Sequence, residues 1–176
     1  MSPFLDRLAT PGVHHRIRGL VYSATSWALA RVAEASPRPL IVLCSSDRSA
    51  QSLYEDLEAF DRSCFGSSLK PLYFPHWDTS LRHSVAPSLR VRQARASVLA
   101  RIAQANPPRI LVTTLPGATF ATLPPEEHSR YALDVAHTSR DPMVAGLGTA
   151  GYFRADSCED PGTFSIRGDL VDVFPV

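Results

Sequence analysis

Two short runs of apolar residues most constrain the fold of this chain. One run covers residues 39–44 (Pro-Leu-Ile-Val-Leu-Cys), and the other covers residues 109–114 (Arg-Ile-Leu-Val-Thr-Thr). Because neither run alternates with polar residues, both are typical of strands that are buried on two faces, as in parallel sheets. A weaker third run covers residues 72–74. We therefore expect the runs at Leu40 and Ile110 to be central parallel strands with helices on both faces.

Helical patterns lie between these runs. Ser46 followed by Asp47 is an N-cap signal, and the apolar residues after it recur at three- and four-residue steps. Ser88 precedes a second pattern over residues 89–105, which the sequence Asn-Pro-Pro then ends. An earlier helix is expected over residues 23–35. Strands that alternate with helices predict an α/β fold with a parallel sheet, which we assign to residues 1–122.

The sequence changes character after residue 122. Residues 123–127 (Leu-Pro-Pro-Glu-Glu) mark a boundary, and a strand over residues 131–135 and a short helix before Gly151 are expected beyond it. Residues 164–174 predict two strands around a Gly-Asp turn. We therefore expect an α+β domain over residues 123–176. Because a two-stranded piece is only marginally stable alone, we expect this domain to be truncated and the natural protein to continue.

Composition excludes several classes of protein. The chain is 44% hydrophobic and 20% charged, which is typical of a globular protein, and no apolar run approaches the ~20 residues of a membrane-spanning helix. The first residues lack a secretory pattern, so we expect a cytoplasmic protein without membrane contact. The widely spaced Cys44, Cys64 and Cys158 do not form a zinc or disulfide pattern. A net charge of +1 gives no global reason to expect nucleic-acid binding.

Residues 19–27 (Gly-Leu-Val-Tyr-Ser-Ala-Thr-Ser-Trp) occupy the place of a phosphate-binding loop in a nucleotide-binding α/β domain. Such a loop needs several glycines, whose N–H groups turn toward the anion, and a lysine that reaches the β- and γ-phosphates. In this degenerate loop, with Gly19, Ser23 and Thr25, one glycine remains, and Lys70 is the only lysine of the chain. Arginine does not substitute readily, because its head group is bulky and planar. We therefore predict a degenerate P-loop-type domain that binds no nucleotide and has no catalytic residues or cofactor.

Histidines and arginines suggest two further sites. The histidines nearest to other metal ligands are His76 and His83 beside Asp78 and the adjacent pair at residues 14 and 15, and neither group has the spacing of a helical metal site. No metal site is therefore expected. The helical pattern after Ser88 carries four arginines that could face DNA. At 100° per residue they spread around the helix, which favours a solvated surface. These four are Arg90, Arg92, Arg95 and Arg101.

Residues 150–175 carry the most specific pattern in the chain. It reads G-Y-x-R-x-D, a short acidic spacer, and P-G-x-F-S-x-R-G-D-φ-φ-D-φ-F-P, where φ is apolar. This pattern resembles the module shared by the bacterial transcription-repair coupling factors (Mfd) and UvrB. Residues 72–79 (Leu-Tyr-Phe-Pro-His-Trp-Asp-Thr) resemble the FP-x-W-[DE]-T region of the coupling factors. A UvrB would carry an intact phosphate-binding loop and a tyrosine-rich hairpin that clamps DNA, and both are absent from this sequence.

The resemblance implies a docking function in nucleotide-excision repair. In coupling factors, a degenerate UvrB-like domain carries an inserted domain that docks on UvrA, whereas RNA polymerase and duplex DNA are partners of the full-length protein, whose ATP-driven motor lies elsewhere. Arg167 matches the family's UvrA-docking arginine in the R-G turn, and Arg154 and Asp169 are weaker candidates beside it. Without the resemblance, Arg167 would be expected merely to pair across its hairpin or with Asp169.

Two rival interpretations stay open. The first is an ATP-dependent helicase module of the UvrB type, which the missing loop glycines and lysine disfavour. The second is a DNA-binding module that uses the arginines after Ser88. If the chain stops before the strands that complete the docking sheet, it should bind UvrA poorly. The strand at residues 170–174 would then expose backbone groups that favour pairing with a second copy.

Overall fold

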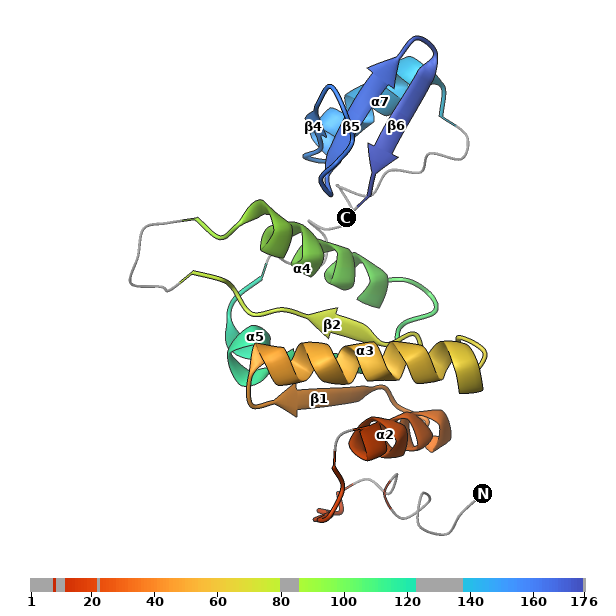
Figure 1. The fold of residues 1–176 in the computed structure, drawn as a ribbon, viewed down its shortest axis with the longest axis vertical. Coiled ribbons are helices and arrows are strands. Elements are labelled where there is room, and N and C mark those ends of the chain that lie inside the picture. Colours follow the sequence, from red (N-terminus) through yellow and green to blue (C-terminus); the bar gives the residue numbers. More distant parts are fainter. Residues whose placement is uncertain (1–7, 9–11, 22, 80–85, 123–137, 176) are drawn as a thin grey trace. The chain divides into compact units, whose positions relative to one another are not determined.

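The computed structural model describes residues 8, 12–21, 23–79, 86–122 and 138–175, which form two compact units (Figure 1). The first unit comprises Met1–His76 and Gln104–Phe120, and the second comprises Trp77–Ala103 and Ala121–Val176. The first unit contains α2 (Ser23–Ala35), β1 (Leu40–Cys44), α3 (Asp47–Cys64), β2 (Leu72–Phe74), β3 (Ile110–Thr114) and α5 (Leu115–Thr119). The second contains α4 (Leu89–Ile102), α7 (Arg140–Thr149), β4 (Phe153–Arg154), β5 (Thr163–Arg167) and β6 (Leu170–Phe174). The domain boundary expected after residue 122 stays a prediction. The two compact units divide the chain differently, because α4 belongs to the same unit as the residues after 120.

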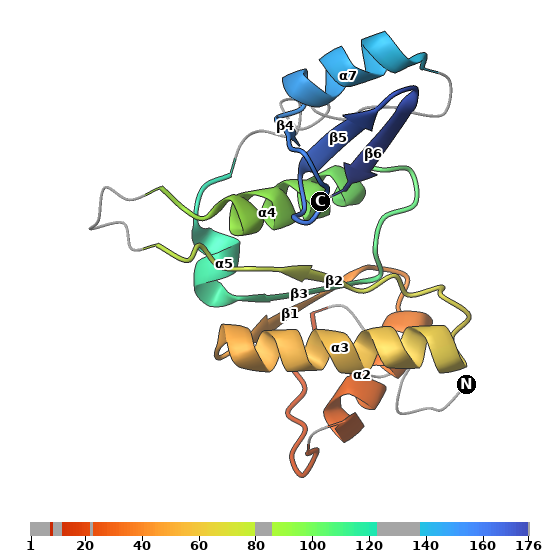
Figure 2. The same cartoon turned by 45° about the horizontal axis from the view of Figure 1, so that its top comes forward.

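A three-stranded parallel sheet forms the centre of the first unit. The strand order is β1-β3-β2, with Leu40 opposite Ile110 and Leu72 opposite Leu111. Helices α2 and α3 cover one face of this sheet, as Figure 2 shows. Their buried Ala30, Ala33, Ala50 and Leu57 pack with Ile110 and Val112 of β3. The predicted α/β fold with a parallel sheet is thus confirmed, and β3 is its central strand.

The prediction for the first apolar run is partly wrong. β1 is an edge strand of the described sheet, and it is buried on one face only. Leu40, Val42 and Cys44 pack against the core, whereas Ile41 and Leu43 are 67% and 54% exposed on the opposite face. A run of consecutive apolar residues satisfies an edge strand as well as a central one, so the sequence pattern could not distinguish them.

The predicted helices are present, and the two with predicted caps, at Ser46 and Ser88, begin directly after them. The hydroxyl of Ser46 accepts a hydrogen bond from the N–H of Ser49, whose own hydroxyl accepts one from the N–H of Ser46; this reciprocal capping box starts α3. Ser88 caps α4 by accepting from the N–H of Val91. The last helical residue of α4 is Ile102, earlier than the predicted end at residue 105.

The second unit contains a small mixed sheet in the order β4-β5-β6, in which β4 is parallel and β6 antiparallel to β5. The predicted short helix is α7, and it ends in a glycine motif. Gly151 has a φ of +86°, its N–H donates to the carbonyl of Gly148, and the N–H of Tyr152 donates to the carbonyl of Leu147. This is a Schellman motif, which explains why the G-Y pair opens the long sequence pattern.

The predicted hairpin is formed by β5 and β6, with Arg167 opposite Leu170. Gly168 has a φ of +60°, and Asp169 does not have a positive φ. A positive φ at the first turn position only is what a type II′ hairpin turn requires, and it favours glycine there. The strand expected over residues 131–135 lies outside the described residues. No helix among the described residues is long and apolar enough to cross a membrane.

Asp61 should be essential for the stability of the first unit. Its buried carboxylate accepts hydrogen bonds from the N–H groups of Leu69 (2.9 Å) and Lys70 (3.0 Å), which fix the loop between α3 and β2. Because Asp61→Ala leaves these donors without their acceptor, we expect it to lower the free energy of unfolding by about 2–4 kcal/mol in urea titrations. The control is Glu58→Ala, which removes an exposed ion pair with Arg62 and should cost less than about 1 kcal/mol. Equal losses for the two variants would contradict this role.

Candidate functional site

The mixed sheet of the second unit has two different faces. Because residues alternate along a strand and opposite residues share a face, Thr163, Ser165 and Arg167 of β5 lie on the same face as their partners in β6. Those partners are Phe174, Asp172 and Leu170. Phe164, Ile166, Val171 and Val173 lie on the other face, where Phe164 is buried. We call the first of these the Arg167 face.

Arg167 is exposed on this face and contacts one acidic neighbour. Its Nε lies 3.7 Å from Oδ2 of Asp172, and their side chains are 65% and 51% exposed. The hydroxyl of Ser165, a residue that is 1% exposed, lies 3.4 Å from the same Oδ2 atom and donates to it. The anticipated pairing of Arg167 across its hairpin is therefore present, but with Asp172 rather than with Asp169.

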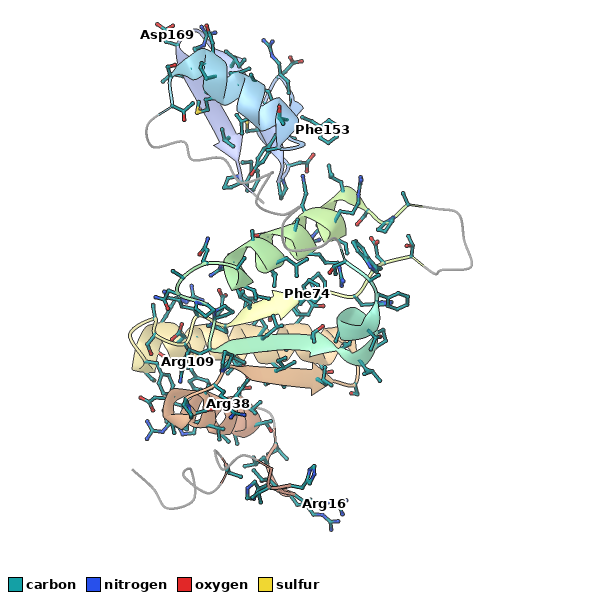
Figure 3. All side chains as sticks on the ribbon, turned by 180° about the vertical axis from the view of Figure 1, so that it is seen from behind. Arg16, Arg38, Phe74, Arg109, Phe153 and Asp169 are labelled. Atoms are coloured by element: carbon teal, nitrogen blue, oxygen red, sulfur yellow. The ribbon has the colours of Figure 1, made fainter. Side chains whose placement is uncertain are left out.

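Three large apolar side chains lie on the same face as this pair. Leu170 is 69% exposed, Phe174 is 40% exposed, and both lie on the Arg167 face. Phe153 of β4 is opposite Thr163 and so shares that face; it is 57% exposed, and Figure 3 shows it projecting from the sheet. Exposed apolar side chains around a charged group are typical of protein-interaction surfaces.

The other two predicted site residues lie elsewhere on the sheet. Arg154 is exposed, but it is opposite Phe164 and therefore lies on the face opposite to Arg167. Asp169 lies at the tip of the β5–β6 hairpin (Figure 3). Arg154 and Arg167 thus lie on opposite faces of the sheet, and Asp169 lies in the turn that follows Arg167. Contact of each with a partner stays a prediction.

The degenerate loop before α2 lies beside an apolar groove. Gly19 has a φ of +83°, and Ser23, the first residue of α2, is exposed. The groove has a volume of about 320 Å³, and none of its described lining residues is basic. Its lining consists of Leu8, Ile17, Gly19, Leu20, Thr25, Ala28, Leu29 and Val32. Such a lining offers a phosphate group neither a cation nor a row of glycine N–H groups.

The Trp-Asp pair of the FP-x-W-[DE]-T region has a structural role that the sequence did not reveal. The guanidinium of Arg95 lies 4.3 Å from the centre of the Trp77 ring, and Arg95 is 1% exposed. Burial lowers the pKa of Arg95 to about 10, so the side chain remains charged at neutral pH. The carboxylate of Asp78 accepts from the N–H of Ser88 (3.0 Å), and hydrogen bonding with the side chain of Ser88, together with this N–H bond, lowers the pKa of Asp78. Arg95 is therefore a packing residue rather than part of a DNA-facing row.

A polar cluster at the carboxyl ends of β1 and β2 was also not anticipated. The hydroxyl of Tyr73 donates to Asp47 (3.2 Å), and burial together with the nearby Asp47 charge raises the pKa of Tyr73 to about 12. Nδ1 of His76 lies 4.0 Å from Asp47, and its ring packs on Phe120. Among the described residues, no group of three His, Cys, Asp or Glu side chains could hold a metal ion. His83 lies outside the described residues.

Comparison with known proteins places this sheet in a family context. Residues 134–176 match the family described as the UvrB interaction domain. The chain is 31% identical to the transcription-repair-coupling factor of Myxococcus xanthus over 168 residues, and 27% identical to that of Bacillus subtilis over 176 residues. It is 26% identical to UvrABC system protein B of Mycoplasma mobile over 168 residues. These matches cover 93%, 94% and 89% of the chain, respectively.

The matched region is a minor part of each relative. The chain spans 14% of the length of each of the two coupling factors and 25% of the UvrB protein. Coupling factors and UvrB proteins are both found at low identity, and these identities do not show to which of the two groups the chain belongs. The chain therefore corresponds to the UvrB-like N-terminal region that both kinds share.

The degenerate loop allows a direct test. We expect no saturable binding of Mg-ATP by isothermal titration calorimetry, because the loop lacks the lysine and all but one of the glycines that hold phosphates. The control variant is Thr25→Trp, which would obstruct the groove beside the loop. Micromolar binding by the wild type that Thr25→Trp abolishes would contradict the prediction.

Proposed function

We propose that this chain is a docking module for the excision-repair protein UvrA and that its origin is a transcription-repair coupling factor. The observation that carries the proposal is the exposed Arg167 face, which lies within the part of the chain that matches the UvrB interaction domain. It combines one arginine with the apolar side chains of Leu170, Phe174 and Phe153. Its described residues offer surface for a protein partner rather than a cavity for a small molecule.

The chemistry of this face suits a partner carboxylate. An arginine presents a planar fork of N–H donors that can hold both oxygens of a carboxylate, and arginine is enriched among the residues that dominate interface energy. The surrounding apolar side chains would lose exposed surface on docking, which favours association and excludes water from the ion pair. We therefore assign Arg167 the main polar contact and the apolar side chains the surrounding contact area.

The choice of a coupling factor rests on the degenerate loop. An ATP-dependent module of the UvrB type needs a phosphate-binding loop, whereas this chain has Lys70 as its only lysine and an apolar groove beside Gly19. A docking module does not need that chemistry. We accordingly propose that the chain itself has no ATPase activity. RNA polymerase and duplex DNA are proposed as partners of the full-length protein, in which the motor would also lie.

Replacing Arg167 should weaken docking much more than replacing Arg154. Loss of a charge-assisted contact costs about 1.5–3 kcal/mol, so Arg167→Ala should raise the dissociation constant for UvrA roughly 10- to 100-fold. If docking is confined to the Arg167 face, Arg154→Ala, which removes the same charge from the opposite face of the sheet, should change the constant less than about threefold, whereas a larger loss would mean that the weaker candidate Arg154 also contacts UvrA. The measurement is biolayer interferometry of the full-length protein against immobilised UvrA, with folding checked by circular dichroism.

Two results would contradict the proposal. One is an Arg167→Ala variant that is folded and binds UvrA as tightly as the wild type. The other is an equal loss for Arg154→Ala, because a surface confined to the Arg167 face predicts unequal effects. Two further measurements test the rival functions: ATP binding would favour the UvrB-like module, and duplex-DNA binding that falls steeply with salt would favour a DNA-binding module.

A further inference from the structure

We propose that Asp172 is a positioning residue that orients Arg167 for docking, and that the buried Ser165 fixes Asp172 in turn. This inference rests on the proposed docking function and adds a device that the sequence pattern did not reveal. Its basis is a short relay on the Arg167 face: Ser165 and Arg167 both contact the same carboxylate oxygen, Oδ2 of Asp172.

The geometry of the relay follows from the register of the hairpin. Ser165 is directly opposite Asp172, and its hydroxyl lies 3.4 Å from Oδ2. Arg167 is opposite Leu170, so it reaches Asp172 diagonally, with Nε 3.7 Å from Oδ2. Diagonal neighbours on antiparallel strands are within reach of long side chains. Because Ser165 is 1% exposed, the relay begins in the packed part of the sheet and ends at an exposed side chain.

The Arg167–Asp172 ion pair is too exposed to contribute much to the free energy of unfolding. Surface pairs between solvated side chains contribute little to the free energy of unfolding, because solvent screens them and both side chains lose rotamer freedom. Both partners here are more than half exposed. What the contact can do is restrict the rotamers of Arg167 before a partner arrives. Ordering a long side chain in advance lowers the entropy cost of association.

The contact also determines which edge of the guanidinium is available. Asp172 approaches Arg167 from the Nε side. The two terminal nitrogens form the other edge of the planar fork, and that edge can hold both oxygens of a carboxylate. The relay thus favours an arginine that points its terminal edge outward. An acidic group of the partner would then approach end-on, on the face that also carries Leu170 and the two phenylalanines.

An effect of Asp172 through its charge and an effect through the orientation of Arg167 predict opposite changes in affinity for Asp172→Asn. If only charge mattered, removing the negative Asp172 would make the face more positive and strengthen binding to an acidic partner. If orientation matters, Asp172→Asn weakens binding, because a neutral amide holds the guanidinium less firmly. The sign of the change in affinity therefore decides between the two explanations.

The experiment measures UvrA affinity for the full-length protein by biolayer interferometry. Asp172→Asn and the charge-neutral Ser165→Ala should each raise the dissociation constant about two- to tenfold. The matched control is Asp156→Asn, which removes an exposed carboxylate outside the sheet and should leave the constant unchanged. In an Arg167→Ala background, Asp172→Asn should have no further effect, because the side chain that it orients is gone.

Several outcomes would overturn the positioning role. These are tighter or unchanged binding for Asp172→Asn, or a loss that persists in the Arg167→Ala background, which would indicate general damage to the sheet. A failed docking proposal gives a different pattern, in which Arg167→Ala itself has no effect or the wild type does not bind UvrA.

A measurement without UvrA keeps the inference testable in that case. The heteronuclear NOE of the Arg167 Nε–H group, recorded near neutral pH, should fall in Asp172→Asn and Ser165→Ala and stay unchanged in Asp156→Asn, because the NOE reports fast motion of the side chain. An Nε–H group that is equally mobile in the wild type and Asp172→Asn would refute the relay.

Discussion

Arg109, directly before β3, connects the strands of the first sheet to the end of α2. Its N–H donates to the carbonyl of Leu69, and its carbonyl accepts from the N–H of Leu40, both at 2.8 Å. Its Nη2 donates to the carbonyls of Ala33 and Ser36 at the end of α2 (Figure 3). Because α2 has no basic residue in its last turn, this distant guanidinium satisfies carbonyl groups that a helix end leaves unpaired. One residue thus holds together the first residues of β1 and β3, the loop before β2 and the end of α2.

The second unit places its buried apolar packing and the proposed docking surface on the two faces of one sheet. Phe164 is buried on one face, and the Schellman motif at Gly151 turns the chain from α7 into β4. The opposite face keeps Ser165 buried, but it presents Arg167 and Leu170 to solvent. Because the strand period is two, neighbouring residues can serve different purposes without conflict. If the Arg167 face is the docking surface that we propose, a substitution of its exposed side chains should therefore change binding with little effect on folding.

The sequence predicted the elements whose signals are local. Branched apolar runs gave the strands, and the caps at Ser46 and Ser88 gave the helix starts, because these features depend on residues a few positions apart. Three features depend on pairing between distant segments and were not predicted: the edge position of β1, the two-residue strand β4, and the faces of the candidate arginines. Arg154 and Arg167 fit one motif, yet only the register of β4 against β5 shows that they face opposite ways. The contact of Arg167 with Asp172 likewise requires the hairpin register.

The choice of cation supports docking over nucleotide chemistry. Lys70 is the only lysine among 18 lysine and arginine residues, and it lies in the loop before β2 rather than near Gly19. A phosphate-binding loop needs the slim, flexible ammonium group of lysine, whereas a planar guanidinium suits fixed contacts with carboxylates, carbonyls and aromatic rings. In this chain arginine makes such contacts: Arg109 on helix carbonyls, Arg95 on Trp77 and Arg167 beside Asp172. Arginine thus stands at the positions where the structure makes fixed contacts, and the residues of the loop before α2 include no lysine.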